Sequence, residues 1–372
     1  MRVKLLSADE HCQWDAYVSS HSASNLYQLS RWKDVIERTY RHKAYYLIAM
    51  EESPGLIGSR DSIVGVLPLV HLKHFLFGNA LISIPFFDFG GIAADNERVE
   101  KMLVQEALSL ARKLGAKEVE LRHIEPISSI KQLKDRPAIL KDVGNGLEGT
   151  SLETKSHKVR MMMPLPESSD ALMKSFKSKL RSQILRPIKD GLRAQVGGID
   201  LLDDFYQVFS INMRDLGSPV HSKRLIEAVA TGLHDRCKVV MVYKDQQPLA
   251  GGVLVGFKDT LENPWASALK KYVRWNANML LYWTMLQYGC DHGYSRFDFG
   301  RSTPDSGTYK FKLQWGAAPT PLYWHHFSLN GGKAKAGGSS DPGRERAVQL
   351  WQRLPVPISR AVGPYIRKYI GL

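Results

Sequence analysis

Hydrophobic and polar residues follow two different periods along most of this chain of 372 residues. A period near 3.6 residues predicts a helix, and a period of two predicts a strand. Helices are expected at 25–40, 96–114, 169–190, 201–216, 223–234 and 276–291. Strands are expected at 45–50, 63–72, 79–84, 117–123, 159–165, 238–244, 249–258 and 265–272. Because helices and strands are interspersed, the pattern predicts an α/β fold of the α+β type.

The same order of elements occurs twice. Tyr45–Met50 resembles Lys238–Tyr243, and in each half a glycine-containing strand, a further strand, a helix and a last strand follow. The matching glycines are Gly65 and Gly251 in the strands, and Gly115 and Gly293 at the helix ends. This repeat predicts a tandem duplication of one α/β unit, with a first domain over 1–150 and a second over 151–330.

The chain changes character after residue 330. A segment rich in glycine, serine and lysine at 331–340 predicts a flexible linker, and helices are expected at 344–354 and 358–370. Residues 331–372 are therefore interpreted as a linker and a basic amphipathic tail. Two roles for this tail stay open: an interfacial membrane helix, or a helix packed onto the body of the protein.

The net charge is +14 and the pI is near 9.5. This charge favours an anionic partner, which could be nucleic acid, a phosphate-bearing substrate or an acidic membrane surface. The three cysteines are widely spaced, which predicts buried free thiols in a reducing compartment and no metal site. No apolar run approaches the roughly 18–20 residues of a membrane span, and the first residues lack a signal core.

Candidate chemistry gathers at 295–316. An alternating strand at Arg296–Phe299 ends at Gly300, a polar loop follows, and a second alternating run at Tyr309–Lys312 predicts another strand. The side chains that such a hairpin would bring together are Asp298, Arg301, Tyr309 and Lys312. Loops set on a rigid sheet often carry function. An ordinary surface hairpin with solvated charges would give the same pattern.

Four motifs resemble those of the FemAB-like proteins, which are tandem-GNAT transferases related to the peptidoglycan bridge-forming aminoacyltransferases. Phe297–Gly316 and the preceding Asn276–Trp283 resemble their C-terminal signature, and Asn25–Trp32 and Phe87–Gly91 resemble their N-terminal motifs. The resemblance covers residues 20–328. It implies two tandem GNAT (acyl-CoA N-acyltransferase-like) domains, followed here by a basic helical C-terminal tail.

The subgroup that the chain resembles most accompanies exopolysaccharide and exosortase (PEP-CTERM) loci in Gram-negative bacteria. Its location would be cytoplasmic, and a peripheral contact with the inner membrane stays open. The family implies attack by an acceptor amine on an activated acyl ester. In the bridge-forming members the donor is aminoacyl-tRNA and the acceptor is a peptidoglycan precursor. Such a reaction needs the two reactants held close together and the developing oxyanion stabilised.

The resemblance assigns roles to residues of the second domain. Lys312 would be catalytic, stabilising charge on the tetrahedral intermediate or the leaving group, and Phe311 would pack against the donor. Asp298 would act as a base or orient Arg301, which would contact an anion. Tyr309 would hydrogen-bond the substrate. Structural alternatives stay open: a solvated lysine, a satisfied buried aspartate and a tyrosine at the rim of the core.

Further substrate-binding candidates follow from the resemblance. Tyr27, Gln28 and Trp32 could line an acceptor cleft, although Trp32 has the spacing of a core residue. Asp88 lies in a loop that ends in two glycines, which permit close approach of a ligand. Arg274 could contact phosphate. The alternative for Asp88 is a turn-capping role.

Two departures affect the choice of donor. An acetyl-CoA-binding GNAT needs a glycine-rich turn before a helix, and residues 274–278 contain no glycine. The coiled-coil arm of the bridge-forming members has no room between Val159 and Phe327, which puts tRNA in doubt. The basic segment Lys174–Lys189 could hold an RNA backbone or a polyphosphate head group. No bound cofactor is expected, and the acyl donor, aminoacyl-tRNA or acyl-CoA, would be a co-substrate.

The sequence therefore predicts an acyl- or aminoacyltransferase acting on an amine or hydroxyl of an anionic or lipid-linked precursor of the cell envelope or of an exopolysaccharide. The first alternative is a CoA-dependent N- or O-acyltransferase that acts on a sugar nucleotide or lipid-linked sugar. The second is a non-catalytic tandem-GNAT scaffold that binds anionic precursors.

Overall fold

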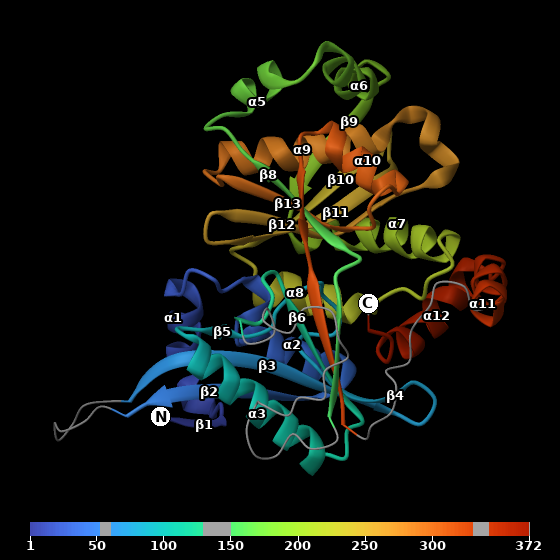
Figure 1. Ribbon diagram of the computed structural model, residues 1–372. Helices are drawn as coiled ribbons and strands as arrows, with labels where there is room; N and C mark the ends of the chain where they lie inside the picture. Colours follow the sequence, from blue (N-terminus) through green and yellow to red (C-terminus); the bar gives the residue numbers. More distant parts are fainter. Residues whose placement is uncertain (53–60, 129–149, 330–341, 372) are drawn as a thin grey trace. The chain divides into compact units, whose positions relative to one another are not determined.

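A computed structural model describes residues 1–52, 61–128, 150–329 and 342–371, and it divides into two compact units (Figure 1). One unit comprises the described residues of Met1–His157, Pro321–Gly337 and Tyr369–Leu372. The other comprises those of Lys158–Thr320 and Gly338–Lys368. Each unit has its own sheet with helices on both faces, which confirms the predicted α/β fold. Neither unit is continuous in sequence, whereas the domains proposed over 1–150 and 151–330 are.

The sheet of the first unit has eight described strands. Their order is β1-β2-β3-β4-β6-β15-β7, and β5 pairs with β3. The strands are β1 (Arg2–Leu5), β2 (Lys43–Glu51), β3 (Ser62–His74), β4 (Gly78–Ile82), β5 (Ala93–Ala94), β6 (Glu118–His123), β7 (Ser151–Lys155) and β15 (Tyr323–Ser328). The pair β4 and β6 is parallel. Because β15 lies between β6 and β7, a segment predicted for the second domain completes the first sheet.

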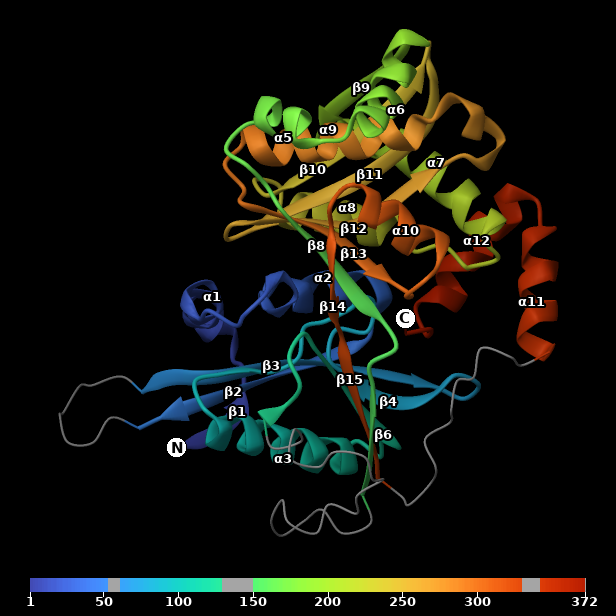
Figure 2. The same ribbon diagram turned by 45° about the horizontal axis from the view of Figure 1, so that its top comes forward.

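Three of the described α-helices cover this sheet. α3 (Glu97–Lys113) packs on one face, and α1 (His11–Ser20) and α2 (Arg31–Tyr40) pack on the other (Figures 1 and 2). α3 begins where the Asn96 side chain accepts a hydrogen bond from the Val99 backbone, and a left-handed Gly115 follows its end. The apolar stripe of α3 is buried in the core, as its period predicts.

The helix predicted over 25–40 is wrong in its first half. A 3₁₀ turn, η2 (Leu26–Gln28), is followed by extended backbone at Leu29 before α2 begins. The Asn25 side chain caps η2 by accepting a hydrogen bond from the Tyr27 backbone N–H. This local bond competes with the backbone hydrogen bonds of a continuous helix through residue 25. Ser30 is the residue that precedes α2, but its side chain makes no capping bond, and its hydroxyl donates to Asp15.

The sheet of the second unit has seven described strands in the order β14-β8-β13-β12-β11-β10-β9. They are β8 (Val159–Pro164), β9 (Leu192–Gly197), β10 (Cys237–Lys244), β11 (Gln247–Phe257), β12 (Thr260–Ala268), β13 (Arg296–Ser302) and β14 (Ala318–Pro321). The pair β12 and β13 is parallel, like β4 and β6. The series β2-β3-β4-α3-β6 therefore matches β10-β11-β12-α9-β13, which confirms the duplication. The strand predicted at 265–272 starts earlier and ends at Ala268, where the 3₁₀ turn η4 (Lys270–Trp275) follows.

Helix α9 (Ala277–Asp291) lies on one face of this sheet, with α5 (Ser169–Ser175) and α6 (Ser178–Lys189) packed on α9 (Figure 2). The other face carries α7 (Leu202–Asp215) and α8 (Lys223–Gly232). The single helix predicted over 169–190 is wrong, because the chain is extended at Phe176. This break turns the buried Phe176 ring against Trp283 and Trp315. The helix α6 continues through Pro187 for two more residues.

The tail forms two helices that pack on α7, namely α11 (Pro342–Gln352) and α12 (Val356–Arg367). Arg360 donates to the Ser210 hydroxyl on α7, and a Cβ at the buried Gly363 would lie 3.0 Å from the Val220 backbone nitrogen. The structure thus favours the packed alternative for these helices. The predicted linker at 331–340 lies outside the described residues.

Three further observations bear on the predictions. Within the described ranges, none of the helices is long and apolar enough to cross a membrane. In the same ranges no group of three or more His, Cys, Asp or Glu side chains is arranged to hold a metal ion. Cys237 and Cys290 are buried free thiols, but Cys12 is exposed, in contrast to the prediction for all three.

Candidate functional site

The stretch 295–316 is a strand, a loop and a helix, and the hairpin predicted there is wrong. After β13, the loop leads into α10 (Gly307–Gln314). The Ser306 hydroxyl caps this helix by accepting from the Tyr309 backbone at 3.3 Å. A four-residue alternation at Tyr309–Lys312 is too short to separate a strand from a helix, and the cap decides for the helix. Tyr309 and Lys312, three residues apart, share a helix face.

Lys312 is buried although it is a lysine, with 7% of its surface exposed. Its Nζ donates to the carbonyl oxygens of Gly300 at 3.1 Å and Arg301 at 2.8 Å. Gly300 has a φ of 72°, a left-handed conformation that favours glycine, and it lies where the register of β13 against β8 shifts. The ammonium group is therefore fixed at the bend of β13. Lys312 lies beside Arg301, as the predicted hairpin implied, but it reaches there from a helix.

Asp298 is also buried, with 2% exposed, and it is paired. Its Oδ2 accepts from Arg160 Nε at 2.6 Å, and its Oδ1 accepts from the Gly300 backbone at 2.7 Å. Glu262 is the register partner of Asp298 on β12, and its carboxylate lies 3.7 Å from the Arg160 guanidinium. Two buried carboxylates thus share one cation. The structural alternative for Asp298, a satisfied buried carboxylate, agrees with these contacts.

Sequence reasoning missed Arg160. It stands on β8, and its carboxylate partners are more than 100 positions away along the chain. The available signal was an arginine within an otherwise apolar strand, because a charge taken out of water is rarely retained without a partner. Arg160 also faces Arg301 in the register between β8 and β13. Arg301 itself is half-buried.

The two aromatic candidates of α10 are half-buried against the core of the second unit. Phe311 makes an edge contact with Tyr282, with ring centroids 5.0 Å apart, and a second with Trp315 at 6.1 Å. Burial raises the pKa of Tyr282 to about 12, so this phenol stays neutral at physiological pH. Phe311 and Tyr309 therefore combine a packed side with an accessible one, as a substrate-facing aromatic requires.

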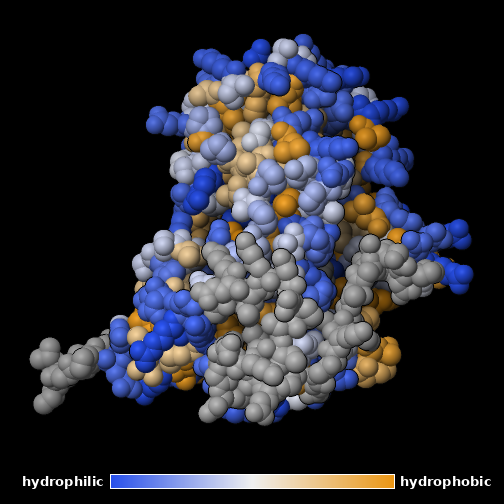
Figure 3. All heavy atoms as spheres, in the orientation of Figure 1, coloured by the Kyte–Doolittle hydropathy of each residue, from blue (hydrophilic) through white to orange (hydrophobic). Residues whose placement is uncertain are grey.

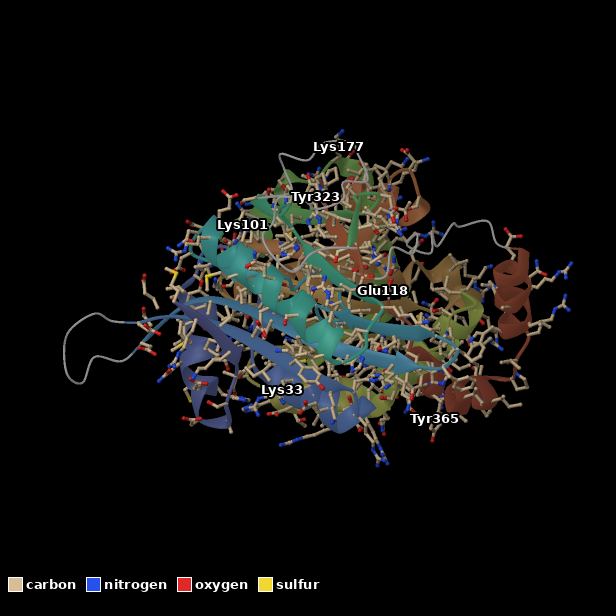
Figure 4. All side chains as sticks on the ribbon, turned by 60° about the horizontal axis from the view of Figure 1, so that its bottom comes forward. Lys33, Lys101, Glu118, Lys177, Tyr323 and Tyr365 are labelled. Carbon is tan, nitrogen blue, oxygen red and sulfur yellow. The ribbon has the colours of Figure 1, made fainter. Side chains whose placement is uncertain are left out.

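An open groove of about 860 Å³ lies beside the end of α10. Its lining is mostly apolar, with contributions from α5, α6, β8 and the residues Leu313–Gly316. Lys177 and Lys179 stand at it and are exposed, and Figure 4 shows Lys177 at the surface. In Figure 3, hydrophobic surface is visible between α5 and α6 with hydrophilic side chains around it. Trp315 lines the groove, and its indole Nε1 has no hydrogen-bond partner among the described residues.

The turn before α9 has a special backbone. Asn276 takes a left-handed conformation, with a φ of 51°, at the position that precedes the helix. Asparagine tolerates this conformation, so the turn forms without the glycine whose absence counted against acetyl-CoA. Arg274 is exposed on η4, with its guanidinium 5.1 Å from the centre of the Trp275 ring.

In the first unit, Tyr27, Gln28 and Trp32 are at most 5% exposed. Tyr27 stacks on Phe87 with centroids 4.4 Å apart, and the indole nitrogen of Trp32 donates to the Leu26 carbonyl. The Gln28 amide donates to a backbone carbonyl at 2.7 Å, and its carbonyl oxygen accepts from the Asn25 backbone. These contacts give the three side chains a packing role, so direct contact with an acceptor is not supported for them.

Asp88 is half-buried in the loop that these residues hold, and its carbonyl accepts from the Trp324 indole at 2.9 Å. The two glycines that follow allow close packing against other residues of the same unit, whereas the prediction was the close approach of a ligand. A Cβ at Gly91 would collide with the His123 ring and lie 2.7 Å from the Arg122 carbonyl. The loop therefore packs closely against β6.

Arg122 organises this loop, and sequence reasoning missed it. It is 1% exposed, its guanidinium donates to the carbonyls of Pro85 and Phe87, and its Nε donates to Glu120 at 2.6 Å. Burial alone would raise the pKa of Glu120, but the Arg122 guanidinium and His326 outweigh it and hold this pKa below its usual range. The loop that carries the candidate Asp88 is thus fixed by a buried arginine.

The arrangement of strands and helices around α10 is similar to that of a GNAT acetyltransferase domain. Residues 175–313 match the family described as "Acetyltransferase (GNAT) domain". Two strains of Staphylococcus epidermidis supply curated relatives named lipid II:glycine glycyltransferase, each 23% identical over 231 residues. The match covers 60% of this chain and 51% of each relative, so the chain spans about half the length of the curated relatives it matches.

Solved structures share the fold across both units. A crystal structure of FemX superimposes with a TM-score of 0.63 at 15% identity, covering 87% of this chain and 97% of that one. A tandem GNAT protein from the clavulanic acid biosynthesis pathway gives a TM-score of 0.55 at 11% identity, covering 90% and 99%. These findings confirm the predicted tandem GNAT fold and the relationship to FemAB-type transferases. The PEP-CTERM subgroup stays a prediction.

Proposed function

We propose that this protein is a FemAB-like acyltransferase that transfers an activated acyl or aminoacyl group to an amine or hydroxyl of a cell-envelope precursor. The observation that carries the proposal is the buried ammonium of Lys312, which two backbone carbonyls hold at the bend of β13. Charge fixed in advance in a poorly hydrated place stabilises a developing oxyanion strongly. The names of the curated relatives favour a lipid-linked precursor as acceptor.

The reaction has one covalent exchange. The acceptor nitrogen or oxygen attacks the acyl carbon, the bond from that carbon to the donor's ester oxygen or thioester sulfur breaks, and the acceptor's proton passes to the leaving group. In this proposal Lys312 stabilises the negative oxygen of the tetrahedral intermediate. Phe311 and Tyr309 flank the reacting groups from α10, and the Arg160–Asp298 pair fixes β13, whose carbonyls hold the Lys312 ammonium. An exopolysaccharide precursor as acceptor is the narrower form of this proposal.

The groove beside α10 is the proposed place for the donor. Both candidate donors carry phosphates, and the groove offers Lys177 and Lys179 beside a mostly apolar lining. Lysines hold phosphate by charge. Its lining includes Leu313 and Gln314, the residues that follow Lys312 in α10, and in this proposal the acyl end of the donor extends from there to the ammonium.

A double variant tests this placement. Lys177→Glu with Lys179→Glu should raise the KM for the donor at least tenfold and leave the KM for the acceptor within about twofold. The matched control is Lys189→Glu, an exposed lysine of the same helix that does not line the groove. Equal KM values in all three proteins would remove the donor from this groove. Titration with aminoacyl-tRNA and with acyl-CoA shows which donor responds.

The second candidate is a CoA-dependent acyltransferase on a sugar nucleotide or lipid-linked sugar. It is favoured by the left-handed Asn276 before α9 and by the match to an acetyltransferase family. Under this alternative Arg274 would contact the phosphates, and Arg274→Ala would weaken acyl-CoA binding but not tRNA binding. A scaffold without activity is the remaining alternative, and full biological activity of Lys312→Met would support it.

A further inference from the structure

The turn between β3 and β4 consists of three large apolar residues, Phe75, Leu76 and Phe77. Their exposed fractions are 88%, 72% and 48%. His74 pairs with Gly78 across the hairpin, so these three residues form the whole connection. Short hairpin loops normally use glycine, asparagine, aspartate or serine, which suit the backbone and water. Gly78, with a φ of 106°, already supplies the backbone freedom here, so the fold does not require bulky apolar side chains.

The base of the turn is held by aromatic contacts within the same unit. The His74 ring lies 4.7 Å from Phe75 and 5.0 Å from Phe77, measured between centroids, and 4.3 Å from Tyr369. The His74 Nδ1 accepts from the Leu76 backbone at 3.2 Å. These contacts hold the base of the turn in place, while its side chains stay exposed. Hydrophobic surface is visible in Figure 3 where Figure 1 shows the turn beyond β4.

Positive charge surrounds this end of the sheet. Lys73 precedes the turn, and Lys43 begins the neighbouring strand opposite His71, with Arg41 just before it. All three basic side chains are exposed. The described acidic residue nearest in the register is Glu118, which starts β6 opposite Ala80 and follows Lys117 (Figure 4). An apolar tip with basic side chains next to it suits an anionic bilayer. The apolar side chains would enter the acyl-chain region, and the basic side chains would contact the anionic head groups.

We propose that the β3–β4 turn, defined as Phe75–Phe77, is a wedge that inserts into the surface of an anionic phospholipid membrane. A second copy of the chain fits less well. A stable interface buries about 800 Å² per partner, and three side chains with these exposed fractions offer roughly half of that, at about 150–250 Å² for a whole aromatic. The exposed basic side chains next to the tip, Arg41, Lys43 and Lys73, would also repel one another in a symmetric pair.

The proposal does not depend on the transferase activity, and vesicle flotation of the full-length protein tests it without turnover. The probes are vesicles of phosphatidylcholine alone and vesicles containing phosphatidylglycerol. We expect binding to the phosphatidylglycerol vesicles, and a loss of at least about 100-fold in partition coefficient for a variant with Phe75→Ser, Leu76→Ser and Phe77→Ser. At 1.4 kcal/mol per factor of ten, 100-fold is about 2.8 kcal/mol. Burial of roughly 110 Å² of apolar surface supplies that.

Two further variants separate insertion of the turn from nonspecific hydrophobic adsorption and from electrostatic attraction. A control with Ile199→Ser, Val273→Ser and Leu350→Ser removes three other exposed apolar residues, which are 55–74% exposed, and should bind like the wild type. Lys43→Glu with Lys73→Glu should weaken binding to the anionic vesicles at least tenfold. A Leu76→Trp protein should show a blue shift of emission on binding and quenching by lipids brominated along the chain.

Three results would overturn the proposal. The first is a wild-type protein that fails to float with phosphatidylglycerol vesicles at low ionic strength. The second is equal flotation of the triple serine variant and the wild type. The third is a dimer of the wild type that the same variant converts to monomers, which would make the tip a contact between copies. Thermal unfolding of the serine variant should stay close to that of the wild type, because the three changed side chains are at least about half exposed and only their ring contacts with His74 and Tyr369 are lost.

Discussion

Replacing Lys312 by methionine removes the charge and keeps most of the side-chain volume. Two charged hydrogen bonds are lost, at 2.8 and 3.1 Å, and the carbonyls of Gly300 and Arg301 lose this donor. Because the site is buried and such bonds contribute about 1.5–3 kcal/mol each, with partial compensation, we expect a loss of roughly 2–4 kcal/mol in unfolding free energy. The loss of a fixed charge at the oxyanion should lower kcat by about 10²–10³.

The assay must separate the two effects. Urea denaturation measures the stability loss, and acyl transfer is measured at a temperature where each variant is fully folded. The control is Leu254→Ala, a fully buried residue in the core of the same unit, which should lose a similar 2–5 kcal/mol. Its kcat should stay within about threefold of the wild type. If Leu254→Ala loses turnover as severely as Lys312→Met, or if Lys312→Met keeps full turnover, the catalytic assignment is refuted.

Three further predictions concern stability. Burial lowers the pKa of His123 to about 4, below its unfolded value of about 6.5, so the unfolded chain binds the proton first. The contribution of His123 to the unfolding free energy is full above about pH 6.5 and is lost as the pH falls toward 4, with a loss of about 2 kcal/mol at pH 5. Urea denaturation at pH 7 and pH 5 should therefore show a smaller loss of stability for His123→Asn than for the wild type. Arg160→Ala takes a cation from buried Asp298 and Glu262 and should cost about 3–5 kcal/mol in unfolding free energy, and a loss below 1 kcal/mol would contradict the pairing. Gly91→Ala forces a Cβ into β6 and should cost more than about 2 kcal/mol by the same measurement, whereas unchanged stability would show that the loop can move away.

Much of the fold was predictable because long elements have clear periods. The helix at 96–114 and the strands on both sides of it appear within two or three residues of their predicted bounds. The parallel pairs β4–β6 and β12–β13 bear out the repeat that the glycines indicated. The helix α10 was missed because four alternating residues carry no decisive period, and the cap at Ser306 acts over a single turn.

The candidate site was predictable only in part, because its contacts are long-range. Asp298 and Lys312 were placed near the end of one strand, and the structure puts both there. Arg160 and Arg122 were missed because what makes them important, the partners that surround them after folding, is invisible in a local pattern. Trp32 had core spacing in the sequence, and it is core.

The central claim is acyl transfer, and one incubation tests it most directly. The protein is mixed with glycyl-tRNA labelled with carbon-13, acetyl-CoA labelled with deuterium, and a lipid-linked amine-bearing envelope precursor, and the mass of the acceptor is measured. We predict that the wild type adds one of the two labelled groups to the acceptor and that Lys312→Met adds it at least about 100-fold more slowly. An acceptor whose mass stays unchanged with both donors, while it binds the folded protein, would contradict the account.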